Sequence, residues 1–562
     1  MFLRSVKARG KKGEKHEYLR LVESYRENGV NKQKVVVNLG RRDLLCAHLD
    51  SLVRLLQTGG IPDSWVKSSQ VIPTQSACYG PVMVMRHLWQ ELGLEGILDG
   101  MGGQRARDNS LAERAFVLAA NRLCSPGSEH HLASWLETDY VCDRHGQRWL
   151  PAWEEHDRVQ VNLSWLQRWY RTLDELVENK ERIEQELFFR LRDLFALEVE
   201  LVFYDLTSTY FEGEGPQELG RYGYSRDGRG KNRQVEVGVV MINGWPIAHH
   251  VFPGNLNDSK TVAGVIDDLQ RRFGLKRVVF VGDRGMVTSD NLTMLRDRQQ
   301  GYLVGLKRRR REGIYELIQK ATGSWQECPG EGKTLVQEVA GDERGVRVFV
   351  VESEERLAYE RAMREKAMER TRVELEGLRA RVSKGQIKSP EKIGAAASRI
   401  LLRHHGHRYY GWELKEGEFH YFEQANLERE KAYEGKYLIQ TEEKGITAVE
   451  AVEAYKSLSE VERAFRSLKD VIRMRPIYHH TAARVQGHIF VAALALLLKR
   501  ALEKKLKAHG SKLSGEAAFE ALRTISVVEM GVGSEVKRGV TSGSHRAREV
   551  LGAMGITSLS LP

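Results

Sequence analysis

Three acidic residues lie at positions where a carboxylate could hold a metal ion. Asp205 comes directly after the apolar segment LVFY, and Asp283 comes after VVFVG. Glu462 lies at the edge of the apolar helical face in YKSLSEVERAFRSLK, residues 455–469. An ionised carboxylate at the end of a buried strand is unfavourable without a partner, and a divalent cation is a common partner.

The chemistry of these three carboxylates indicates phosphoryl transfer. Hard oxygen ligands suit Mg²⁺ or Mn²⁺ better than zinc. Two such ions about 3.5–4 Å apart activate an attacking oxygen and stabilise the leaving oxygen in an in-line displacement. The substrate would then be a phosphodiester. Other interpretations stay open: Asp205 caps a turn through Thr207, or Asp283 caps a helix through Gly285. Glu462 would then belong to a solvated helix face.

The element that carries Glu462 is predicted to be one helix. Val461, Ala464 and Phe465 recur at helical spacing and predict a buried face. Tyr455 and Lys469 lie seven residues on either side of Glu462, so one continuous helix would point the three residues the same way.

The elements around the two aspartates alternate between strands and helices. Residues 197–307 predict three strands, a helix, a strand, a helix and a fifth strand, which is an α/β order. Polar groups at the ends of such strands are where sites are usually built. A charged, partly β-like block then reads as an insertion, and KYLIQTE resumes a strand before the helix with Glu462.

The ends of the chain have a different texture. Two alternating segments around an Asn-Gly pair predict a β-hairpin, and its Lys and Arg side chains are equally consistent with DNA contact and with a solvated face. Helical patterns follow, one of them capped by Ser110. We expect six parts: a β-hairpin region at 1–70, a helical domain at 71–195 with possible contacts to DNA, a core at 196–307 and 436–500, an insertion at 308–435, and a basic helical region at 501–562.

Composition bounds the class of protein. The chain has 562 residues, and Lys plus Arg exceed Asp plus Glu by 87 to 76, which favours a polyanionic partner. The five cysteines form no CxxC pair, which argues against a zinc site and a disulfide framework. The basic start has no apolar stretch behind it, and the longest apolar run is half a membrane span. We expect a cytoplasmic protein with no membrane partner.

The ordered motifs resemble a known family. YDLTSTYFEG, GNLNDSKT, VGDRGM and YKSLSEVERAFRSLKDVIRMRPIYH are similar to the DDE transposases of bacterial insertion sequences, and more narrowly to the IS-four superfamily. That group has an RNase H-like core with an insertion domain, and a helix signature of Tyr, two residues, Arg, three residues, Glu, six residues and Lys. Tyr455, Glu462 and Lys469 match this signature, and Leu458 stands at the Arg position.

The resemblance implies a fold, a reaction and a set of residues. The fold would be an RNase H-like α/β core with a large mixed insertion. Asp205, Asp283 and Glu462 would be the catalytic, metal-binding triad, with Mg²⁺ as the cofactor and Mn²⁺ as a substitute. The protein would cut double-stranded DNA at transposon ends and transfer the 3′-OH strand into target DNA, as a homodimer or larger assembly at the bacterial nucleoid. Tyr455 and Lys469 would hold phosphates.

Further residues are candidates for DNA contact. We expect Arg463 or Arg466 to replace the missing signature Arg, and Arg284, Arg473 and Arg475 to line the DNA path. Trp412 is a candidate for stacking on an unpaired base, with core packing as the alternative. Two rival functions remain: a catalytically decayed DNA-binding relative, to which Leu458 is the hint, and a nuclease that cuts without joining.

Overall fold

The computed structural model divides the chain into two compact units. One contains Met1–Ser76 and Val528–Gly539, and the other contains Ala77–Val527 and Val540–Pro562. The structure describes residues 2–9, 15–27, 29–45, 48, 71–101, 110–151, 153–154, 157–195, 201–282, 286, 288–306, 313–330, 332–341, 345–532 and 535–561.

The smaller unit is built from β-strands. The predicted hairpin is present, with Gly29 in the left-handed region at φ 80° beside the turn. A further strand extends it into the antiparallel order β1-β2-β3, followed by the short helix α1 (Arg42–Leu45). These strands are β1 (Phe2–Arg9), β2 (Lys15–Glu27) and β3 (Val30–Arg41). A second sheet has the order β19-β18-β4 and consists of β4 (Val71–Cys78), β18 (Ser526–Val532) and β19 (Glu535–Val540).

A mixed sheet of nine strands lies at the centre of the larger unit, in the order β12-β13-β14-β17-β11-β10-β7-β8-β9. Strands β7, β10 and β11 are mutually parallel, and the other pairs are antiparallel. The predicted order of strand and helix is confirmed: β7 (Leu201–Tyr210), β8 (Gln234–Ile242), β9 (Trp245–Pro253), α9 (Val262–Phe273), β10 (Val279–Gly282), α10 (Ser289–Asp297) and β11 (Gly301–Gly305). The resumed strand is β17 (Lys436–Thr441).

The predicted insertion has two structural parts. Its first strands, β12 (Gln326–Cys328), β13 (Thr334–Ala340) and β14 (Arg347–Ser353), extend the central sheet because β14 pairs with β17. Helix α11 (Ile314–Lys320) packs beside them. The second part is a module with its own apolar cluster, built from α12 (Glu354–Ser383), α13 (Pro390–Arg403), β15 (Tyr410–Lys415), β16 (Glu418–Glu423) and α14 (Leu427–Ala432).

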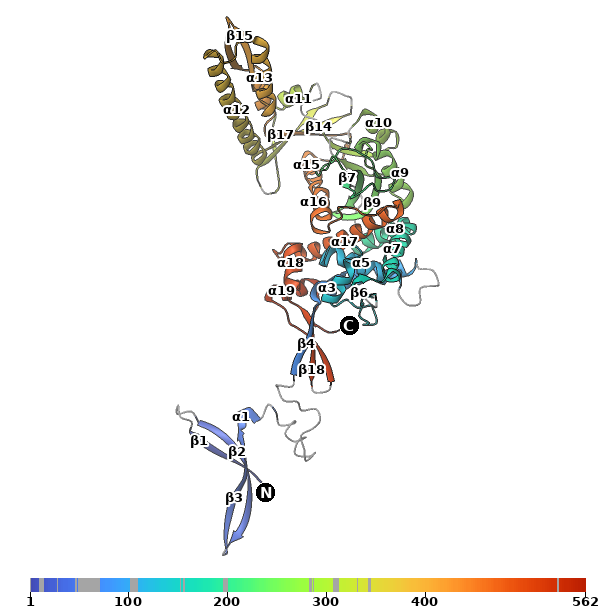
Figure 1. Ribbon diagram of the computed structural model, residues 1–562, viewed down its shortest axis with the longest axis vertical. Helices are drawn as coiled ribbons and strands as arrows, with labels where there is room; N and C mark the ends of the chain where they lie inside the picture. Colours follow the sequence, from blue (N-terminus) through green and yellow to red (C-terminus); the bar gives the residue numbers. More distant parts are fainter. Residues whose placement is uncertain are drawn as a thin grey trace. The chain divides into compact units, whose positions relative to one another are not determined.

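A helical layer covers the sheet on the side of β9. It is formed by α3 (Gly80–Glu91), α4 (Leu94–Asp99), α5 (Leu111–Cys124), α6 (Leu132–Thr138), α7 (Leu163–Glu178) and α8 (Lys180–Phe195). Ser110 caps α5 as predicted, with its hydroxyl accepting from the amide of Glu113. The short strands β5 (Trp153–Glu154) and β6 (Asp157–Val161) pair within this region. Helix α17 (Ala482–Ala508) contacts α5, α7 and β9, and Figure 1 shows it passing between the sheet and this layer.

The C-terminal prediction needs a correction. Residues 501–562 are not a purely helical region, because β18 and β19 lie between α18 (Gly515–Leu522) and α19 (His545–Met554). The first residues of this range belong to α17, whose Ala501 and Leu502 are buried. The length and composition of α17 alone would allow it to cross a membrane, but 89% of its most apolar window is buried in the protein, as in a core helix.

Candidate active site

A turn interrupts the segment with the signature residues, and a π-helical turn follows directly on its second helix, so the prediction of one continuous helix is wrong. Tyr455 lies on α15 (Ala448–Lys456), Glu462 on α16 (Ser459–Arg466), and Lys469 in a π-helical turn, Ser467–Val471. The two residues between α15 and α16 form a turn. The predicted buried face is confirmed, because Val461, Ala464, Phe465, Leu468 and Ile472 are all buried.

Asp205 lies on the face of the sheet that α16 covers. The hydroxyl of Tyr204 donates to Thr261 at 3.0 Å, on the side of α9. Side chains alternate along a strand, so Phe203 and Asp205 point to the opposite face, where α16 packs against β7. The Asp205 side chain is half-buried, and its Oδ1 accepts the amide of Leu206 at 2.8 Å.

The second predicted aspartate follows the neighbouring parallel strand. The ladder between β7 and β10 ends with Phe203 opposite Val281. Asp205 and Asp283 each come two residues after this pair in the sequence. Asp283 and Arg284 lie outside the residues that the structure describes.

Glu462 is exposed and lines a cavity of about 540 Å³ between α15, α16 and the sheet. Tyr455 lines the same cavity and stacks on Tyr437, with ring centroids 5.8 Å apart. Its hydroxyl lies against Gly305 at the end of β11. Two of the three signature residues therefore share one cavity, although they lie on different helices.

The cations in the cavity of Glu462 were not expected from the sequence. Leu458 is 7% exposed and packs in the core, so it offers no charge. Arg356 from α12 and Lys456 from α15 line the cavity. Arg463 and Arg466 instead line another cavity, of about 640 Å³, with residues of α17. No sequence signal links Arg356 to this place, because it is contributed by the insertion.

Lys469 is held by Asp227, an acid that no sequence pattern links to it. Its Nζ lies 2.9 Å from Asp227, and the two side chains are 11% and 7% exposed. Arg475 pairs with the same carboxylate and also with Asp470. These contacts raise the pKa of Arg475 although burial works against its charge. Asp227 lies in GYSRDGRGKN, which is not a phosphate-binding loop by sequence.

Trp412 lies inside the module of the insertion. It is half-buried on β15 and stacks on Phe419, with ring centroids 5.9 Å apart. Its indole also lies against Gly394 of α13. This is the packing role that the sequence left open as the alternative to base stacking.

The family model for "Transposase DDE domain" matches residues 201–498, which include the central strands, α15, α16 and most of α17. The chain belongs to the DDE transposase family. The model for "IS1634 family transposase, N-terminal domain" matches residues 3–60, which indicates a transposase of an insertion sequence. The protein is thus an enzyme of the DDE transposase class, a class that uses divalent metal ions and acts on DNA.

Comparisons with curated proteins and with solved structures do not refine the assignment of this DDE transposase. No curated protein matches the chain. One similar solved structure is a cryo-EM structure of a piggyBac transposase synaptic complex with hairpin DNA. It has 8% identity and a TM-score of 0.34, and the match covers 81% of this chain and 82% of that chain.

Proposed function

We propose that this transposase cuts DNA at the ends of its insertion sequence and joins the freed 3′-OH ends to target DNA. The observation that carries the proposal is the packing of α16, with Glu462, on the face of β7 that bears Asp205. Strand β10 lies parallel to β7, and its sequence continues into Asp283. The order β9-β8-β7-β10-β11, with three parallel strands, supports an RNase H-like core.

The acidic residues present suit a divalent metal. Asp205 is a half-buried carboxylate near the middle of a strand, and Glu462 is a carboxylate open to a cavity, so both offer hard oxygen ligands. Asp205, Asp283 and Glu462 would hold Mg²⁺, or Mn²⁺ in its place. The bound metal supplies activation of the attacking oxygen and stabilisation of the leaving oxygen. Tyr455, Lys456 and Arg356 would position the phosphodiester beside Glu462.

The proposal includes an oligomeric state and a cellular location. Joining two ends requires both ends in one complex, so we propose a homodimer or larger assembly on double-stranded DNA in the bacterial cytoplasm. The IS-four assignment belongs to this proposal as well. Three of its four signature residues are present, and Leu458 is the departure.

Cleavage of DNA that carries the element's own ends tests the triad. Asp205→Asn and Glu462→Gln should each lower the cleavage rate by roughly 10²–10³-fold or more, because stabilisation of the transition-state charge is lost. Binding of the same DNA should persist. Glu453→Gln, which changes an exposed acid on α15, is the matched control and should cleave normally. Wild-type cleavage by Asp205→Asn would refute the assignment.

A second assay separates transposition from cutting alone. Pre-cleaved ends and a target plasmid are supplied with Mg²⁺, and joined product is measured. A transposase should give joined product, whereas a nuclease should give none. Wild-type protein that binds ends but neither cuts nor joins would indicate a decayed relative.

A further inference from the structure

The segment that follows α16 has unusual backbone geometry around an arginine. The π-helical turn Ser467–Val471 precedes Arg473, whose φ of 52° lies in the left-handed region. A π-helical turn is rare in any sequence, and a positive φ is uncommon in residues other than glycine; both features often occur at functional sites. Arg473 is exposed and forms no ion pair with any residue that the structure describes. The backbone at Arg473 is thus constrained, and its guanidinium is left without a described acidic partner.

Arg473 lines a strongly basic cavity of about 830 Å³. The cavity lies between the turn before α6, the segment that follows α16, and the start of α17. Its other cationic or imidazole side chains include Arg122, His130, Arg475, His480 and Arg484. Among the described residues that line it, Glu129 is the one acid. The cavity therefore favours an anion.

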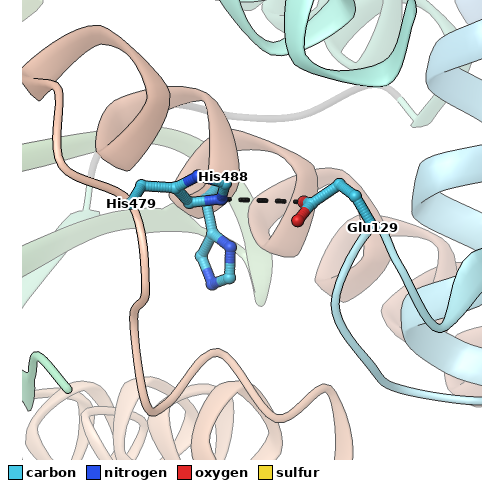
Figure 2. Close-up of side chains that lie close together, drawn as sticks. All are labelled: Glu129, His479 and His488. Atoms are coloured by element: carbon cyan, nitrogen blue, oxygen red, sulfur yellow. Dashed lines mark ion pairs between the residues drawn. The ribbon is translucent and has the colours of Figure 1, made fainter. Parts of the chain in front are cut away.

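The single acid of this cavity is neutralised within a buried cluster. Figure 2 shows Glu129 beside His479 and His488, with the ion pair to His479 at 3.7 Å. Arg122 also lies 3.7 Å from Glu129. Burial opposes the charge of Glu129, but His479 and Arg122 lower the pKa of Glu129 well below its usual range. Glu129 therefore stays ionised, and these neighbours balance its charge.

The cluster does not suit a metal ion, although the ligand atoms of Glu129, His479 and His488 all lie within 4.8 Å of one another. Arg122 lies 3.0 Å from Nδ1 of His488, and Nε2 of His488 lies 2.9 Å from the carbonyl of Met474. Burial lowers the pKa of His488 to about 3, so its ring is neutral and donates through Nε2. A metal would have to displace the guanidinium of Arg122 from Nδ1.

The arginines of the cavity differ in how far they are already engaged. Arg475 is paired with Asp227 and Asp470. Arg484 lies 3.6 Å from Asp174 and over the ring of Tyr170, with 4.8 Å to its centroid. Arg122 belongs to the buried cluster. Arg473 is left as the arginine whose charge no described acid balances.

We propose that this cavity is a second DNA contact, in which Arg473 binds a backbone phosphate away from the cavity of Glu462. The cluster of Arg122, Glu129, His479 and His488 serves as the support that ties the turn before α6 to the segment with Arg473. The inference rests on the proposed function in that DNA is the partner. A phosphate contact of this kind carries no base preference.

Binding of a labelled duplex of random sequence, measured over a range of salt concentrations, tests this proposal. Arg473→Gln should weaken binding by roughly five- to tenfold and lower the slope of log affinity against log salt by about one. Arg473→Lys should keep the slope. Arg399→Gln removes the same charge from an exposed position on α13 and should change neither quantity. Inorganic phosphate should compete with the duplex less well for Arg473→Gln than for the wild type.

Several outcomes would overturn the proposal. An unchanged slope for Arg473→Gln, or an equal loss for Arg399→Gln, would show that Arg473 makes no phosphate contact. Thermal unfolding of Arg473→Gln should match the wild type, and a lower melting temperature matched by Arg473→Lys would assign the effect to folding. Because the duplex is not cleaved, failure of the triad variants to affect catalysis would refute the proposed function and leave this result standing.

Discussion

A buried carboxyl group on β8 links the stability of the larger unit to pH. Burial raises the pKa of Glu236 from 4.5 to about 7, while Arg226, at 2.9 Å, opposes the shift and Asp258 adds to it. The folded protein then holds a proton that the unfolded chain releases near pH 4.5. Stability should therefore fall as the pH rises from about 4.5 to 7.

Glu236→Gln tests this linkage. The variant should be more stable than the wild type at pH 8.5 by on the order of 2–3 kcal/mol, because no charge is buried, and the difference should vanish near pH 4.5. Denaturant unfolding at both pH values measures it. Glu218→Gln, at an exposed position in the loop between β7 and β8, serves as the control. An advantage of Glu236→Gln that is equal at both pH values would contradict the argument.

At the scale of residues, the sequence predicts which side chains could carry chemistry better than it predicts which residues contact one another. An acid that follows an apolar segment, or that lies at the edge of an apolar helical face, can be recognised from local sequence, so Asp205 and Glu462 could be proposed. Lys469 and Asp227 are 242 residues apart, and neither pattern indicates the other. Arg356 comes from an insertion with a separate pattern. Contacts of this range depend on how the chain packs, which local periodicity does not contain.

The elements around the site depend on a close approach between α15 and β11. A Cβ atom at Gly305 would collide with the hydroxyl of Tyr455, and its ring carbon Cζ would lie at 2.9 Å. The absence of a side chain at Gly305 therefore lets Tyr455 lie between the end of β11 and the cavity of Glu462. A side chain at Gly305 would force the Tyr455 ring to move.

Gly305→Ala should displace Tyr455 and destabilise the protein by about 1–3 kcal/mol, because the side chain overfills a packed site. Thermal and denaturant unfolding measure the loss. Gly264→Ala is the control: it lies within α9, with nothing within 4 Å of the added Cβ, and should be neutral or stabilising by about 0.5–1 kcal/mol. Equal effects of the two substitutions would show that Gly305 has no special packing role.

The type of an element was predictable where the apolar periodicity is strong. Whether a helix is continuous was not predictable. The buried face of α16 and the alternation of strand and helix are present as expected. The break at Ser457 and Leu458 has no glycine or proline to announce it. Leu458 continues the apolar pattern and is buried. It would therefore occupy the core in a continuous helix as well, and the pattern does not reveal the turn. A π-helical turn is likewise invisible to a search for 3.6-residue periodicity.

At the scale of the whole molecule, the cores differ from the predicted domain boundaries. One apolar cluster runs through the helical layer, the central sheet and α17, so helices α3 to α8 share a core with the strands. The predicted insertion, 308–435, contains β12, β13 and β14 of that sheet, whereas Leu375, Leu378 and Ile393 belong to a separate cluster. A change in sequence pattern shows where the insertion starts but not where the sheet ends. The sheet strands of the insertion and its separate module are both charged, and both mix strand and helix patterns.

Two deletions distinguish these boundaries. Replacing residues 368–424 by a short Gly/Ser linker removes most of the separate cluster and leaves β14 paired with β17. This variant should unfold cooperatively and bind the random duplex within about twofold of the wild type. Deleting residues 308–435 removes β14 and should expose the unpaired edge of β17, which favours aggregation. Size-exclusion chromatography and thermal unfolding measure both. If the variant that lacks residues 308–435 is soluble and unfolds cooperatively, the insertion has the boundaries predicted from the sequence. If the variant that lacks residues 368–424 aggregates, the module supports the fold of the sheet.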